Sequence, residues 1–176
     1  MKKFLKILGA IVALLVLYCA IAMAFFDSHY HGEQSVTINA PAEKIWQNVN
    51  SMKAINSWNP WMKLDPNLKG TYSGNSGEIG DFYHWKGNDD VGEGEQKISK
   101  IVPHEKVETE IHFIKPFESK AVSNVLLMSK ETGTKVTWTM DFECDLMMKP
   151  MKPFMNWKMN KSFSEGLNNL KVLAEK

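Results

Sequence analysis

Two stretches decide the fold of this chain: WNPWMKLDP at positions 58–66 and GEIGDFYHWKGNDDVGEGEQKISKI at positions 77–101. They carry an aromatic cluster and a run of evenly spaced glycines. From Lys69 onward apolar residues recur at every second position, which is typical of strands. Glycines inside a strand mark bends or bulges. The pattern therefore predicts curved antiparallel strands, with Gly92 and Gly94 as bending points.

Turn signals divide the chain after Lys69 into about six successive strands. The clearest strand is 135–144, in which five apolar residues alternate with five polar ones. Its apolar residues are Val136, Trp138, Met140, Phe142 and Cys144. Such alternation predicts a sheet with one covered face and one polar face.

Helical patterns flank these strands. A short strand at Ser35–Ile38 leads into a helix start at NAPAE, positions 39–43, and a second short helix is expected at Met52–Ser57. The last segment, Phe154–Glu175, repeats apolar residues at helical spacing. The residues expected to cover the sheet are Trp157, Phe163, Leu167, Leu170 and Ala174. This order predicts an α+β domain.

Together with INAPAEKIW at 38–46 and GLNNLKVLAEK at 166–176, these stretches resemble the START-like (SRPBCC) superfamily. Within it the chain is similar to the bacterial polyketide cyclase/dehydrase-like branch, over Gln34–Lys176. The resemblance implies a helix-grip fold: a sheet of about six to seven strands wrapped around a long C-terminal helix, with two short helices after the first strand. It also implies a cavity between sheet and helix.

The N-terminus predicts a membrane anchor. Residues 7–26 are uncharged and almost wholly apolar, and 20 such residues match a bilayer core of about 30 Å. Lys2, Lys3 and Lys6 precede the segment, which predicts a single pass of the cytoplasmic membrane with the domain on the extracytoplasmic side. The alternative is a signal peptide cleaved after Ala24. We therefore divide the chain into an anchor (1–26), a polar linker (27–33) and a START-like domain (34–176).

Charge and cysteine content exclude some functions. All 21 basic residues are lysines, and setting aside the three before the anchor leaves 18 against 20 carboxylates. A weakly acidic domain without arginine lacks the footprint of a nucleic-acid-binding protein. Of the two cysteines, Cys19 lies in the anchor and Cys144 on a strand, so the domain forms no internal disulfide and Cys144 is expected to be buried.

Large apolar side chains are the candidates for the cavity wall, because indoles suit a pocket mouth and methionines adapt to apolar ligands. Alternatively they are simply large core residues. The predicted cavity residues are Trp58, Trp61, Tyr83, Trp85, Phe113, Trp138, Met140, Phe142, Phe154 and Trp157.

No motif for metal-dependent, nucleophilic or nucleotide chemistry occurs, and we expect neither a metal nor another cofactor. His29 and His31 could hold a metal weakly, but a solvated linker explains them better. Asp81 is the one weak catalytic candidate, since it shares a strand face with Tyr83 and Trp85. The structural alternative for Asp81 is a carboxylate that accepts hydrogen bonds from backbone near a turn.

We therefore expect a membrane-tethered protein that binds a hydrophobic small molecule or lipid without changing it chemically. One alternative is an enzyme of the polyketide cyclase, dehydratase or hydrolase type, which would need an ionisable side chain in the cavity. A second is a protein-interaction module with a filled core, which would need an exposed apolar groove. The sequence names no protein partner.

Overall fold

A computed structural model describes all 176 residues. Seven antiparallel strands form one sheet in the order β1-β7-β6-β5-β4-β3-β2. The strands are β1 (His29–Ile38), β2 (Lys69–Ser73), β3 (Phe82–Lys86), β4 (Glu93–Val102), β5 (Lys106–Lys115), β6 (Ser119–Lys130) and β7 (Gly133–Glu143). The meander from β2 to β7 pairs each strand with its successor, and β1 closes the order beside β7. The predicted α+β helix-grip fold is confirmed.

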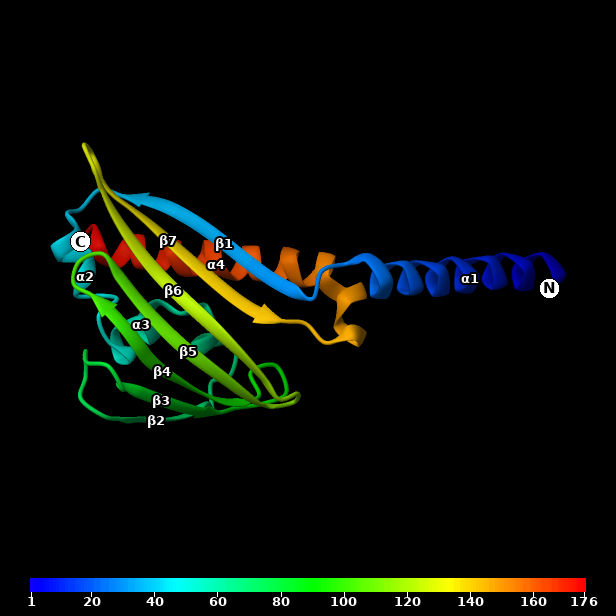
Figure 1. Ribbon diagram of the computed structural model, residues 1–176, viewed down its shortest axis with the longest axis horizontal. Helices are drawn as coiled ribbons and strands as arrows, with labels where there is room; N and C mark the ends of the chain where they lie inside the picture. Colours follow the sequence, from blue (N-terminus) through cyan, green and yellow to red (C-terminus); the bar gives the residue numbers. More distant parts are fainter.

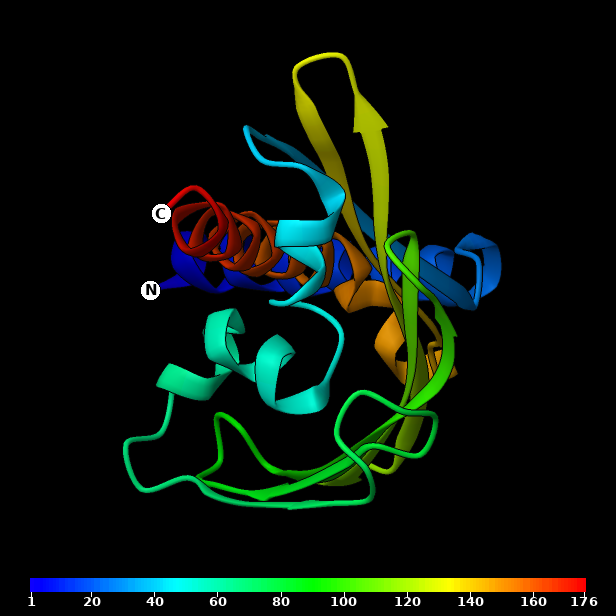
Figure 2. The same ribbon diagram turned by 90° about the vertical axis from the view of Figure 1, so that its left-hand side faces the viewer.

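The helices that follow β1 lie within the curve of this sheet (Figures 1 and 2). The short α2 (Ala42–Trp46) and α3 (Met52–Trp58) follow β1, and a 3₁₀ turn, η1 (Pro60–Lys63), follows them. A second 3₁₀ segment, η2 (Leu146–Met151), leads into α4 (Lys152–Ala174), which packs against β1 and β7. Phe163, Leu167, Leu170 and Ala174 of α4 are buried, as predicted. Trp157 is 62% exposed, so its prediction as a core residue was wrong.

The segment expected as a linker is part of the sheet. His29–Glu33 pairs with Asp141, Glu143 and their neighbours as the first half of β1. Tyr30 faces inward and stacks on Phe142 with ring centroids 4.5 Å apart. The hydrogen side chain of Gly32 leaves room for the Tyr30 ring and for Phe163. Because the outward residues here are histidine and glutamate, the sequence of this segment is typical of a polar linker.

The outer face of β7 is less open than its polar sequence indicates. Thr137 and Thr139 are only 9% and 5% exposed, and Thr139 Oγ1 accepts a hydrogen bond from Asn124 Nδ2 at 3.2 Å. Neighbouring strands on both sides cover these threonines, because β7 is an inner strand of the sheet.

The N-terminal helix α1 (Lys2–Phe25) projects away from the sheet (Figure 1). It is long and apolar enough to cross a membrane, and almost all of it is exposed; a signal sequence would meet the same criterion. Only its C-terminal part contacts the domain, at η2. There the Tyr18 hydroxyl donates a hydrogen bond to the Pro150 carbonyl at 2.8 Å.

Candidate functional site

A cavity of about 300 Å³ lies between the concave face of the sheet, the α3–η1 segment and the start of α4. Sixteen of its 22 lining residues are hydrophobic. This volume is at the lower end of ligand-binding pockets, which enclose about 300–1,000 Å³. The space between sheet and helix is therefore not filled by side chains.

Five aromatic side chains form much of the wall. Tyr83 and Trp85 are neighbours on β3, with ring centroids 6.0 Å apart, and Phe113 on β5 meets Trp85 edge-on at 6.0 Å. On the opposite side, Trp61 of η1 meets Trp138 of β7 edge-on at 5.4 Å. The rings thus form two groups on opposite sides of the cavity, and the contacts within each group limit the rotation of its rings.

Gly94 positions Trp85. A Cβ at residue 94 would lie 2.5 Å from the Trp85 ring and 2.8 Å from the His112 carbonyl oxygen, so only glycine lets the indole lie across β4. The Trp85 indole N–H donates to the Val91 carbonyl at 3.3 Å. The predicted bend is present here as a shift of register between Glu93 and Gly94.

The polar groups of the cavity are paired mainly with one another. Gln96 Nε2 donates to Thr109 Oγ1 at 2.7 Å, and the Trp138 indole N–H donates to Ser123 Oγ at 2.9 Å. Ser123 Oγ in turn donates to the Thr139 carbonyl at 2.9 Å. The side-chain oxygen of Gln96 has no protein partner. The wall thus offers an acceptor for one donor group of a mainly apolar guest.

No carboxylate, lysine, histidine or cysteine lines the cavity. Tyr83 is its one ionisable residue, and burial raises the pKa of Tyr83 to about 12, with a smaller contribution from Tyr72. The Tyr83 hydroxyl is 3.6 Å from Met62 Sδ, to which it donates a hydrogen bond. At neutral pH the wall therefore carries no charge.

The structure brings together seven of the ten predicted cavity residues: Trp61, Tyr83, Trp85, Phe113, Trp138, Met140 and Phe142. Trp58 does not line the cavity, because it is packed behind Trp138 and its indole N–H donates to the Asn48 carbonyl at 2.8 Å. Phe154 and Trp157 lie outside as well. Their ring centroids are 5.9 Å apart, and both side chains lie on the solvent-facing side of α4.

Sequence reasoning missed the lining residues with small or polar side chains, among them Gln96, Thr109 and Ser123. Thr109 lies on the inward face of β5, and its role as a polar partner inside the cavity depends on the register between β4, β5 and β6. Met148 and Met159 also line the cavity.

Asp81 is structural. Its carboxylate is 3% exposed, and Oδ2 accepts hydrogen bonds from the backbone N–H of Met52 at 3.0 Å and of Gly77 at 2.9 Å. It fixes the start of α3 to the loop before β3 and does not line the cavity. As a catalytic candidate Asp81 is therefore corrected to the structural alternative.

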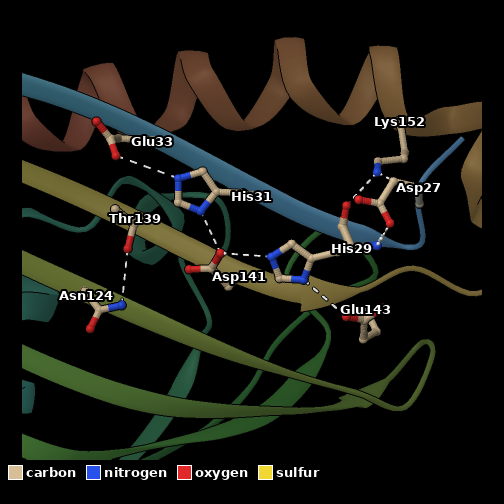
Figure 3. A network of polar contacts seen from close by, with 9 residues as sticks. All are labelled: Asp27, His29, His31, Glu33, Asn124, Thr139, Asp141, Glu143 and Lys152. Atoms are coloured by element: carbon tan, nitrogen blue, oxygen red, sulfur yellow. Dashed lines mark hydrogen bonds and ion pairs between the residues drawn. The ribbon is translucent and has the colours of Figure 1, made fainter.

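The two histidines near the N-terminus belong to a polar network on the outer face of β1 and β7 (Figure 3). His31 Nδ1 lies 2.6 Å from Asp141 Oδ1, and His29 bridges Asp141 and Glu143 at 3.3 and 3.1 Å. The hydrogen bond with Asp141 raises the pKa of His31. No group of side chains in the structure has the arrangement of a metal site.

Comparison with solved structures shows the same fold in distant proteins. A protein of unknown function from Staphylococcus aureus is 16% identical with a TM-score of 0.62, covering 84% of this chain and 94% of its own. A protein from Mesorhizobium loti is 14% identical with a TM-score of 0.61, covering 82% and 96%. Ara h 8.0201 is 13% identical with a TM-score of 0.61, covering 83% and 97%.

No curated protein sequence matches the chain significantly. The family model described as "Polyketide cyclase / dehydrase and lipid transport" matches residues 29–175, which run from the start of β1 to the last residue but one. The match begins at the first residue of β1, in agreement with the structural boundary. The chain therefore belongs to the polyketide cyclase/dehydrase and lipid transport family.

Proposed function

We propose that this protein binds a hydrophobic small molecule or lipid in the cavity without changing it chemically, and that α1 tethers it to the membrane. The observation that supports binding is the wall itself, which is aromatic and aliphatic and carries no charged group. Burial of apolar ligand surface yields about 25 cal/mol per Å². Such a wall provides binding energy, and its one ionisable side chain, Tyr83, is neutral at neutral pH and so provides no general base.

The cavity also restricts the class of ligand. An ionic group inside it would lose its hydration without gaining a counter-ion, because the wall has no charged side chain. The unpartnered oxygen of Gln96 suits a single hydroxyl or amide N–H. The proposed ligand is therefore a mainly apolar molecule, and any charged head group stays at the cavity mouth.

The length and composition of α1 support the tether. Lysines occur at positions 2, 3 and 6, whereas the first lysine after the helix is Lys44. This asymmetry favours a cytoplasmic N-terminus and an extracytoplasmic domain. The full-length protein should stay in the membrane pellet after a carbonate wash. A soluble mature protein beginning at Phe25 would show instead that the segment is a cleaved signal peptide.

Binding can be tested with a fluorescent fatty acid that accepts energy from tryptophan. Trp85→Ala and Trp61→Ala should weaken binding, since each removes part of the wall. Trp157→Ala is the matched control, because this indole is exposed and does not line the cavity. Native mass spectrometry of the purified protein should in addition reveal a co-purified apolar molecule. Equal affinity in all three variants would refute the cavity as the binding site.

The family description also keeps an enzyme of the polyketide cyclase or dehydratase type as the second candidate. Such an enzyme would have to polarise carbonyl groups with Gln96, Thr109 or Tyr83, since these are polar groups of the wall. Turnover of an aromatic polyketide that is lost in Gln96→Leu, while probe binding persists, would establish the enzyme.

A further inference from the structure

One end of the domain contains α1, η2 and the strand connections that surround the cavity. The register of β1 with β7 pairs His29 with Glu143, so η2 begins at the end from which α1 emerges. The antiparallel pairing places two hairpins at this same end: the β5–β6 hairpin (116–118) and the β3–β4 loop (87–92). Figure 1 shows these connections on the side of the sheet that faces α1.

The cavity is more open toward this end. Lining residues from the opposite half, such as Ile55, Val107 and Val125, are buried. Several lining residues nearer to α1 are only partly buried. They are Val91, Ser119, Met148 and Met159, with Phe113 and Phe142 on the adjoining strand ends. The mouth of the cavity is therefore on the side of the domain from which α1 leaves.

Next to this mouth is an exposed apolar surface, the η2–α4 patch. Its five large side chains are all more than half exposed: Leu146, Met147, Met151, Phe154 and Trp157. Single exposed apolar residues are ordinary, but five within 12 positions are typical of an interaction surface. Residues 146–164 contain four lysines and no carboxylate, so this segment is positively charged.

The contact between η2 and α1 fixes the position of the patch along the axis of α1. Tyr18, which donates to Pro150, lies seven residues before the end of α1, about 10 Å along the helix axis. Lys152 Nζ also donates to the carbonyls of Asp27 and His29 at 2.8 and 2.7 Å, which fixes the start of α4 to the chain leaving α1. If α1 spans the membrane, η2 lies within the interfacial layer, as amphipathic surface helices do.

We propose that the η2–α4 patch docks into the outer surface of the bilayer that holds α1, and that the cavity takes up its ligand directly from that leaflet. The proposal rests on the proposed tether and cavity, and it adds the source and route of the ligand. The positive charge of the segment complements an anionic lipid surface. Met147 and Met148 are adjacent in η2, the first 76% exposed and the second lining the cavity, so η2 alone separates cavity and lipid here.

The docking is measured on the full chain in vesicles of phosphatidylethanolamine and phosphatidylglycerol. A fluorescent label is placed at residue 147 by Met147→Cys, after Cys19→Ala and Cys144→Ala. Ile79→Cys is the matched control, because Ile79 is an equally exposed apolar residue on the β2–β3 connection at the opposite end. Lipids brominated on their acyl chains should quench the label at 147 and not the label at 79. Equal quenching at both positions would overturn the docking.

The route is measured without cysteine substitutions, by energy transfer from the cavity tryptophans to a dansyl fatty acid added to the vesicles. Met147→Glu with Trp157→Glu should slow uptake, because each large apolar side chain withdrawn from the bilayer lowers the docked population about tenfold. Ile79→Glu should leave the rate unchanged. In detergent, equilibrium affinity should be the same in all variants, since none of these residues lines the cavity.

The outcomes separate this proposal from the proposed function. A wild-type rate in the double glutamate variant refutes uptake through the patch, even where the probe binds the cavity. Absence of energy transfer in the wild type, both in detergent and in vesicles, refutes the proposed function and the route together. The quenching at residue 147 then still decides whether the patch docks.

Discussion

Trp138→Ala tests whether the helix is held to the sheet by the wall of the cavity. The indole is 3% exposed, stacks on Phe163 at 4.6 Å and meets Trp58 and Trp61 edge-on at 4.9 and 5.4 Å. A buried tryptophan cut to alanine costs about 3–5 kcal/mol. Because part of this indole borders empty space rather than packed atoms, we expect a value near the lower end, about 3 kcal/mol.

The hydrogen bond of Trp138 contributes little to that cost. When the indole is removed, Ser123 Oγ can still donate to the Thr139 carbonyl, so no donor on Ser123 is left unpaired. Ser123→Ala instead leaves the buried indole N–H without its acceptor, which should lower the free energy of unfolding by about 1–3 kcal/mol. A double-mutant cycle of Trp138→Phe and Ser123→Ala should therefore give a coupling of about 0.5–1.5 kcal/mol.

The measurement is urea unfolding followed by circular dichroism, with thermal unfolding as a second probe. For a chain of this size, a loss of about 3 kcal/mol should lower the melting temperature by about 6–12 °C. Trp157→Ala is the control and should be within about 0.5 kcal/mol of the wild type, because this indole is exposed. A loss below about 1 kcal/mol for Trp138→Ala would refute the packing of Trp138 between sheet and helix.

Three further predictions follow from single contacts. Asp81→Asn should cost about 1–3 kcal/mol of stability, because the carboxylate accepts two backbone hydrogen bonds while buried, and it should leave probe binding intact; normal stability with lost binding would contradict the structural role. Gly94→Ala should weaken both folding and probe binding, since its Cβ would displace the Trp85 ring; retention of wild-type affinity would show that β4 yields instead. The pKa of His31 is raised in the folded protein, so its stabilising contribution is present below about pH 6.5 and is lost as pH rises through the folded pKa. Because His31 is half exposed, this loss should be below about 1 kcal/mol, and it should shrink in Asp141→Asn, where only Glu33 remains beside His31, when unfolding is compared at pH 5.5 and 8.5.

The fold was predictable because each element repeats its pattern several times. The alternation from Val136 to Cys144 and the helical spacing from Phe163 to Ala174 each have only one arrangement that buries all the apolar residues. The first half of β1 was missed for the opposite reason. Its inward positions are Tyr30 and Gly32, and a glycine that accommodates a neighbouring ring gives no apolar signal.

The cavity was predictable in composition but not in detail. Aromatic residues on strands, such as Tyr83 and Trp85, line the cavity in the structure, because the strand period fixes the face on which they lie. Trp58, Phe154 and Trp157 were misassigned, since neither a short helix nor a helix start fixes a direction until it packs. The sequence pattern also could not show that the polar groups Gln96 and Thr109 meet across two strands.

Two aromatic residues of α4 that were predicted in the cavity wall lie on the outside of the domain. Phe154 and Trp157 were grouped with the cavity because their size indicates a ligand-facing role, yet they face outward beside the cavity mouth. Large apolar side chains remain exposed at a cost in solubility unless another phase covers them. Under the proposed tether, the bilayer around α1 supplies such a phase, because η2 contacts the last turns of α1. The segment from η2 into α4 thus has two apolar sides, with Met148 and Met159 toward the cavity and Met147 and Trp157 exposed on the side that the proposal places against the bilayer. In the proposed docking, a ligand that moves between the two sides never has to enter water.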